Sequence, residues 1–133
     1  MRIMADANII VSAILFPQST VAKMLAHVVD THKLVLSQYT IDEVKDVFDK
    51  KFPQKIAEMK KFQKEIPYER FILKKAVYKK YPEIRDVDDL PVLANAIESK
   101  VDLLVTGDKD FENIAIETPQ IMSPREYINK YME

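Results

Sequence analysis

The 133-residue chain contains no cysteine and only one glycine. The absence of cysteine excludes disulfides, thiolate catalysis and cysteine-based zinc sites, and it agrees with a reducing, cytoplasmic environment. A single glycine cannot build a Walker-type phosphate loop or a dinucleotide-binding glycine pattern. No apolar stretch approaches the roughly 20 residues of a membrane span, and the N-terminus carries no signal-peptide pattern. With a formal net charge of −1, any phosphate-bearing partner would need a local basic patch or a bound metal.

Strand-like and helical patterns alternate along the chain, which predicts a parallel sheet with helices on its faces. Short apolar runs predict strands at 2–5, 34–36, 103–106 and 120–122. Helical patterns occupy 9–16, 19–31, 41–48, 54–64, about 87–99 and the segment that opens at Pro124. Residues 67–81 are not assigned, since 71–73 fits both a strand and a helix. The chain has no linker or repeat, so we expect a single domain over residues 1–133.

Acidic residues follow two of these strands. Asp6 comes directly after the first strand with Asn8 close behind, and Asp108 and Asp110 come after the turn at Gly107. Sites in open α/β sheets form at the carboxyl ends of the strands. The structural alternatives are an N-cap role for Asp6 and ordinary turn chemistry for Asp108. We favour function for Asp6, because an acid at the end of a buried strand has limited solvent and its charge needs a partner.

Glu43 has two interpretations of equal weight. Its spacing from Thr40 fits a capping box, which is a structural role. It also lies in the first turn after the second strand, at the edge of the sheet where Asp6 is expected. The neighbouring acids belong to a solvated helix face; they are Asp42, Asp46 and Asp49.

The segment 86–89 supplies three further aspartates, whose structural alternative is compensation of the helix dipole. At about 100° per residue, Asp89 flanks the apolar face of the following helix and Asp86 lies close to it. Asp88 points to the opposite side. We therefore favour Asp89 as the third site acid and Asp86 as its support, while the register among the three stays open.

Several carboxylates packed together repel one another unless a cation lies between them. Because the predicted ligands are oxygens, with no cysteine or site histidine, Mg²⁺ or Mn²⁺ is favoured over zinc. We expect His27 and His32, near a helix end, to be surface residues.

The ordered set of motifs resembles the PIN-domain family, and in particular its small stand-alone members, the VapC-type toxins of toxin–antitoxin pairs. The motifs are Asp6-Ala7-Asn8, Glu43 within 41–44, the segment 85–93, and 105–111. The resemblance implies a Rossmann-like α/β/α sandwich with a mainly parallel central sheet. It implies a metal-dependent endoribonuclease whose acids match Asp6, Glu43, Asp89 and Asp108, with Asn8 and Thr106 bracing the site. It also brings in an antitoxin and a second copy of the chain as candidate partners.

This interpretation predicts hydrolysis of RNA phosphodiesters with one or two Mg²⁺ or Mn²⁺ ions, which lower the pKa of the attacking water and stabilise the leaving oxygen. Lysines would contact the phosphates, although most of them fit a solvated helix face equally well; they are Lys50, Lys51, Lys55, Lys60, Lys61 and Lys64. One rival is a phosphatase of haloacid-dehalogenase type with Asp6 as nucleophile, but that class needs an aspartate where Asn8 stands. The second rival is a binding module without catalysis.

Overall fold

The computed structural model describes residues 1–74, 90–111, 114 and 116–132. Their strands form a five-stranded parallel sheet in the order β3-β2-β1-β4-β5. The strands are β1 (Arg2–Ala5), β2 (Lys33–Ser37), β3 (Glu69–Phe71), β4 (Leu103–Val105) and β5 (Gln120–Met122). The expected parallel α/β architecture is confirmed, and the unassigned segment contributes β3 at one end of the sheet.

Six α-helices accompany the described strands. They are α1 (Ala7–Leu15), α2 (Thr20–Thr31), α3 (Gln38–Lys51), α4 (Ile56–Glu65), α5 (Leu90–Glu98) and α6 (Pro124–Tyr131). The short 3₁₀ turns are η1 (Pro53–Lys55) and η3 (Lys109–Phe111). Caps explain two of the boundaries: Ser19 accepts from the Ala22 N–H, and Ser123 forms a capping box with Glu126 before Pro124. The start expected for α5 near residue 87 lies outside the described residues.

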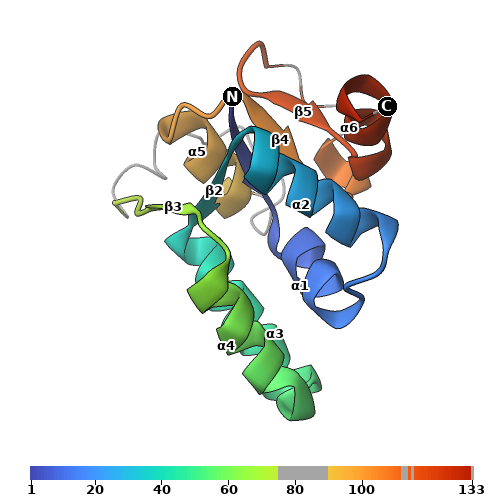
Figure 1. Cartoon of the computed structure of the whole chain (residues 1–133). Helices are drawn as coiled ribbons and strands as arrows, with labels where there is room; N and C mark the ends of the chain where they lie inside the picture. The colour runs from blue at the N-terminus through green and yellow to red at the C-terminus, as the bar shows by residue number, and fades with distance from the viewer. Residues whose placement is uncertain (75–89, 112–113, 115, 133) are drawn as a thin grey trace.

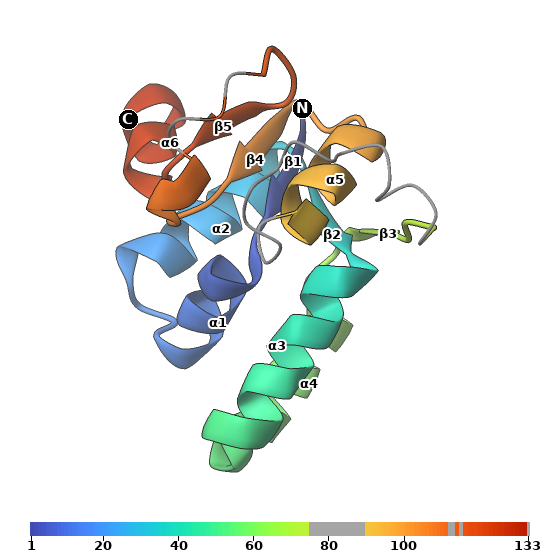
Figure 2. The same cartoon turned by 180° about the vertical axis from the view of Figure 1, so that it is seen from behind.

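Alternating strand residues enter two separate cores. Ile3, Leu34 and Leu103 pack on one face with α1, α2, α3 and α6, whereas Met4, Val35 and Leu104 pack on the other face with α5. This period of two follows from the strand geometry. The result is a three-layer α/β/α sandwich, and α3 and α4 form a hairpin that extends away from the sheet (Figures 1 and 2).

The order of the strands fixes where a site can form. The chain moves from β1 to β2 and β3 on one side, and β4 and β5 add on the other side of β1. The order therefore reverses between β1 and β4, and the crevice at their carboxyl ends is the usual ligand position in such sheets. Among the described residues, no single helix is long and apolar enough to cross a membrane; the bent pair α1 and α2 meets that test jointly, by composition and length alone.

Candidate active site at the carboxyl ends of β1 and β4

Asp6 stands at the crevice and is buried there. Ala5 is paired with Val105, and the Asp6 N–H reaches the Val105 carbonyl at 3.4 Å. The residue is 6% exposed. Its Oδ1 accepts a hydrogen bond from the Ile9 N–H at 3.1 Å, so Asp6 is the N-cap of α1. The capping interpretation of Asp6 is thus confirmed. The cap involves only Oδ1 and leaves the second carboxylate oxygen for another partner.

The second carboxylate oxygen of Asp6 accepts a hydrogen bond from the Thr106 hydroxyl, across the two strand ends. The same hydroxyl oxygen accepts from the Asp108 N–H at 3.1 Å. Thr106 is 3% exposed, so one buried hydroxyl fixes both the orientation of Asp6 and the start of the loop that carries Asp108. Thr106 thus joins Asp6 to the Asp108 loop, and its role in bracing a functional site stays a prediction.

Asp108 lies on the exposed side of the crevice. Its Oδ1 accepts from the Asp110 N–H at 2.9 Å, a local turn that holds the loop. Asp110 therefore braces Asp108 through its backbone, and its side chain is exposed. Asn8 is also exposed, in the first turn of α1.

The electrostatics of the crevice disfavour two carboxylates without a cation. Burial raises the pKa of Asp6 above its ordinary value, and the nearby charge of Asp108 adds to this increase. The hydrogen bonds from Thr106 and from the Ile9 N–H oppose it. The ion pairs among the described residues are Arg2–Glu69 and Lys50–Asp46, so neither brings a cation to Asp6 or Asp108.

Gly107, between Thr106 and Asp108, is not explained by backbone geometry. Its φ is not positive, and a Cβ built there would meet nothing within 4 Å. The turn therefore does not require glycine for its conformation. A side chain at this position would extend into open space.

The expectation that Thr40 caps α3 is wrong. The N-cap is Ser37, whose hydroxyl accepts from the Thr40 N–H at 3.1 Å, while Thr40 is buried within the helix. The serine at the end of β2 is better placed because the helix starts directly after the strand. Glu43 is consequently the sixth residue of α3 and not a capping glutamate. It is half-buried and lies about 8 Å along the helix from its start, on the helix that leaves the β2 end of the same sheet edge.

The third acidic motif is not placed, because Asp86, Asp88 and Asp89 lie outside the described residues. The described part of α5 begins immediately after them at Leu90. Within the described ranges, no group of three or more potential metal ligands comes together. The structure thus joins Asp6, Thr106 and Asp108 directly and places Glu43 one strand away.

Two described acids nevertheless suit a hard divalent cation. Asp6 and Asp108 offer carboxylate oxygens from neighbouring strand ends, as Mg²⁺ and Mn²⁺ prefer. The raised pKa of Asp6 marks an electrostatic conflict, caused by burial and by Asp108, that a cation would remove. The residues present fit a metal whose remaining ligands come from elsewhere.

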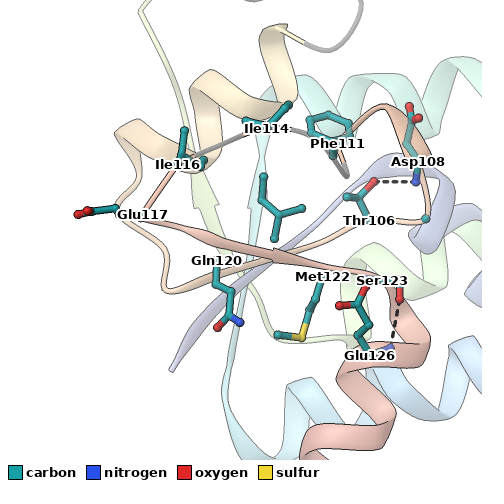
Figure 3. A pocket seen from close by; sticks show the side chains of 12 residues that line it. Thr106, Asp108, Phe111, Ile114, Ile116, Glu117, Gln120, Met122, Ser123 and Glu126 are labelled. Atoms are coloured by element: carbon teal, nitrogen blue, oxygen red, sulfur yellow. Dashed lines mark hydrogen bonds between the residues drawn. The ribbon is translucent and has the colours of Figure 1, made fainter.

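A cavity of about 450 Å³ adjoins Asp108, and no sequence motif predicts it. Figure 3 shows Phe111, Ile114 and Ile116 on one side of β5, and Gln120, Met122 and Glu126 on the other. The remaining lining residues are Thr106, Gly107, Asp108, Glu117, Ile121 and Ser123. The described lining residues fall within 106–111, 114, 116–117 and 120–126, and their approach across the end of the sheet is a tertiary feature.

The two histidines are less exposed than expected. His27 and His32 are half-buried, and the His27 Nδ1 lies 2.7 Å from the hydroxyl of Tyr127. Tyr127 is fully buried, and burial raises its pKa to about 12. The group joins α2 to α6 and lies apart from the acids.

Comparison with known proteins agrees with this architecture. A family model described as PIN domain matches residues 2–110. Among solved structures, VapBC2 from Rickettsia felis, crystallised with a DNA fragment from its promoter, matches with a TM-score of 0.69 and 21% identity. The match covers 92% of this chain and 97% of the other. No curated protein is significantly similar in sequence.

Proposed function

The chain belongs to the PIN domain family, and from this membership we propose that it is a metal-dependent endoribonuclease, the VapC-type toxin of a toxin–antitoxin pair. Proteins of this family are generally nucleases that use divalent metals. Membership supports this function over the haloacid-dehalogenase alternative, which Asn8 already disfavoured. The shared fold with the VapBC2 structure supports the toxin assignment.

One observation carries the proposal: a buried carboxylate is held on both oxygens beside a second carboxylate. Asp6 is fixed by Ile9 and Thr106 next to Asp108. A purely structural N-cap needs only the bond from Ile9. A buried carboxylate beside a second carboxylate destabilises the fold unless a bound ligand offsets the cost.

The proposed divalent cation is held by Asp6 and Asp108 together with Asp89 and Glu43. When bound, it supplies a water of lowered pKa and stabilises the leaving oxygen. Thr106 keeps the Asp6 carboxylate in one orientation, and the Asp110 N–H does the same for Asp108. Asn8, which is exposed in the first turn of α1, can donate from its amide.

We assign contacts with the phosphate backbone of the RNA to lysines of the α3–α4 hairpin. The lysines proposed for this role are all exposed along it, and one of them, Lys50, is paired with Asp46 at 3.1 Å. Phosphate contacts of this kind give affinity and no sequence choice. Any sequence preference must then arise elsewhere on the molecule.

The test is cleavage of a mixed RNA, and separately of a phosphatase substrate, with Mn²⁺ and with a chelator. We expect Mn²⁺-dependent cleavage of RNA alone, lost in Asp6→Asn and Asp108→Asn and retained in Asp102→Asn, an exposed aspartate before β4. Calorimetric titration of Mn²⁺ should show binding that weakens in the Asp6→Asn, Asp108→Asn double variant. Binding without any cleavage would identify a non-catalytic module, and cleavage by the double variant would remove the proposed site.

A further inference from the structure

We propose that the cavity between Phe111, Ile114 and Ile116, strand β5 and the start of α6 binds a guanine base of the RNA next to the cleaved phosphate. The inference rests on the proposed nuclease function and adds a base preference to it. The cavity shares Asp108 and Thr106 with the crevice. A nucleotide whose phosphate lies at the acids can therefore place its base in this cavity.

The walls of the cavity suit a flat apolar ring. Phe111, Ile114, Ile116 and Ile121 supply the apolar surface, and the volume of about 450 Å³ is within the range of small-ligand sites. Because β5 is the last strand of the sheet, a ring in the cavity would lie across its outer edge. Proteins that read single-stranded RNA commonly hold splayed bases in apolar slots with polar groups at the rim.

The charge of the residues that line the cavity favours a base over a phosphate as the ligand. Among the lining residues that the structure describes, none is a lysine, arginine or histidine, whereas Asp108, Glu117 and Glu126 are acidic. A phosphate would be repelled. Carboxylates only accept hydrogen bonds, so the site selects a base edge that donates them.

Guanine fits this requirement best among the four bases. Its N1–H and its N2 amino group are adjacent donors that one carboxylate can accept together, as an Arg fork is accepted. Glu126 uses Oε1 to accept from the Ser123 N–H at 3.2 Å, which occupies only part of the capacity of a carboxylate. Gln120 adds an amide on the same side of β5 (Figure 3).

The backbone of β5 adds a further acceptor. The Gln120 N–H bonds to the Asp102 carbonyl, and the Met122 carbonyl accepts from the Thr106 N–H. Backbone groups alternate in direction along a strand. The N–H and carbonyl of Ile121 consequently point away from β4, toward the outer edge of β5.

Binding is tested first, without metal, on the full chain. Guanosine, inosine and adenosine are titrated while NMR follows the methyl groups of Met122 and Ile121. Inosine keeps N1–H and lacks only the N2 amino group. We expect guanosine to bind about tenfold more tightly than inosine, since a hydrogen bond to a charged group is worth roughly that factor or more.

The variant Glu126→Gln removes the acceptor charge and keeps the capping box, which accepts glutamine as well. We expect it to lower guanosine affinity to about the inosine level with little change in melting temperature. Glu65→Gln, at the exposed end of α4, is the matched control and should change nothing. Equal affinities for guanosine and inosine, or guanosine binding unaffected by Glu126→Gln, would overturn the site.

Cleavage separates this inference from the nuclease proposal. Uridine-rich RNAs carrying one guanosine, or one inosine at the same position, are compared. Cleavage beside the guanosine that falls about tenfold with inosine supports the site. Equal cleavage rates with guanosine and with inosine would mean that the protein is a nuclease without this subsite. Selective guanosine binding by a chain that cuts no RNA retains the subsite and rejects the nuclease.

Discussion

At the scale of single residues, one buried hydroxyl organises the crevice. Thr106 donates to Asp6 and accepts from the Asp108 N–H. Thr106→Val keeps the shape and removes both bonds. Because the hydrogen bond from Thr106 lowers the pKa of Asp6, we expect the pKa of that carboxyl to increase further in the variant, and cleavage to fall at least tenfold. Carboxyl NMR without metal measures the first effect and single-turnover kinetics the second.

Thr31→Val, at the exposed end of α2, is the control for this exchange. It should leave both readouts unchanged. An Asp6 pKa that stays the same in Thr106→Val would mean that the hydroxyl does not hold the carboxylate in solution.

Glu43 can now be tested without interference from a helix cap. Since Ser37 caps α3, Glu43→Gln removes no helix cap, and we expect the loss of this charged site group to lower the rate by about 100-fold or more. Asp49→Asn, on the exposed face of the same helix, serves as the comparison. Normal cleavage by Glu43→Gln, measured in single-turnover assays, would restrict the site to aspartates.

At the scale of elements, the strands and most helix bounds were predictable because each pattern is local. Ser19 and Pro124 marked helix starts correctly, and three-residue β5 was found as an apolar run. The cap of α3 was missed because two hydroxyl residues, Ser37 and Thr40, precede the same apolar stripe. Only the strand end decides between them. Strand β3 lies in the segment that the sequence leaves unassigned, because its partly exposed residues lack a clear period.

The helical phase of α5 yields a prediction for the third acid. Leu93 is buried on this helix, and Asp89 precedes it by four residues, on the same side of an ideal helix. We expect Asp89→Asn to reduce cleavage more than Asp88→Asn, with Asp86→Asn in between. Single-turnover cleavage of one RNA by the three variants decides the order. If Asp88→Asn is the most damaging, the register assigned to this motif is wrong.

The contact between α2 and α6 should depend on pH. Burial lowers the pKa of His32, and the N-terminal amine and His27 add to the effect. A base with a lowered folded pKa binds fewer protons when folded, so its contribution to stability is lost as pH falls below its ordinary value near 6.5. Relative to His32→Asn, we expect the original chain to lose stability from pH 7 toward pH 5. Urea unfolding at several pH values measures it, and identical slopes would exclude His32 as the cause.

At the scale of the whole molecule, the sequence predicts which strand ends lie together, but it does not predict the cavity beside them. The acids follow strands, so their shared edge follows from a parallel sheet alone. The cavity beyond Asp108 depends on where Phe111, Ile114 and Ile116 lie relative to β5, and isolated isoleucines in the sequence do not indicate such a cavity. Local periodicity carries no information on such contacts between separate segments.

The ionised form of Asp6 that the proposed function requires should destabilise the metal-free protein. An acid with a raised folded pKa favours the protonated form when folded, so at neutral pH its ionisation destabilises the metal-free fold. Asn in its place still accepts from Ile9, and the Thr106 hydroxyl can accept from the new amide. We therefore expect Asp6→Asn to be more stable than the original chain at pH 7 without metal, and the difference to shrink as pH falls.

Added Mn²⁺ should reverse that order. A ligand that binds only the folded state at about 100 times its dissociation constant adds about 2.7 kcal/mol, which for a domain of this size is roughly a 10 °C rise in melting temperature. The original chain should gain this increase, and Asp6→Asn should gain much less because one of its carboxylates is missing. Thermal unfolding of both proteins, with chelator and with Mn²⁺, gives the four values needed. An equal rise in melting temperature for both proteins would place the metal away from Asp6. If Asp6→Asn is the more stable protein with chelator and the original chain is the more stable with Mn²⁺, then Asp6 favours metal binding and destabilises the metal-free fold.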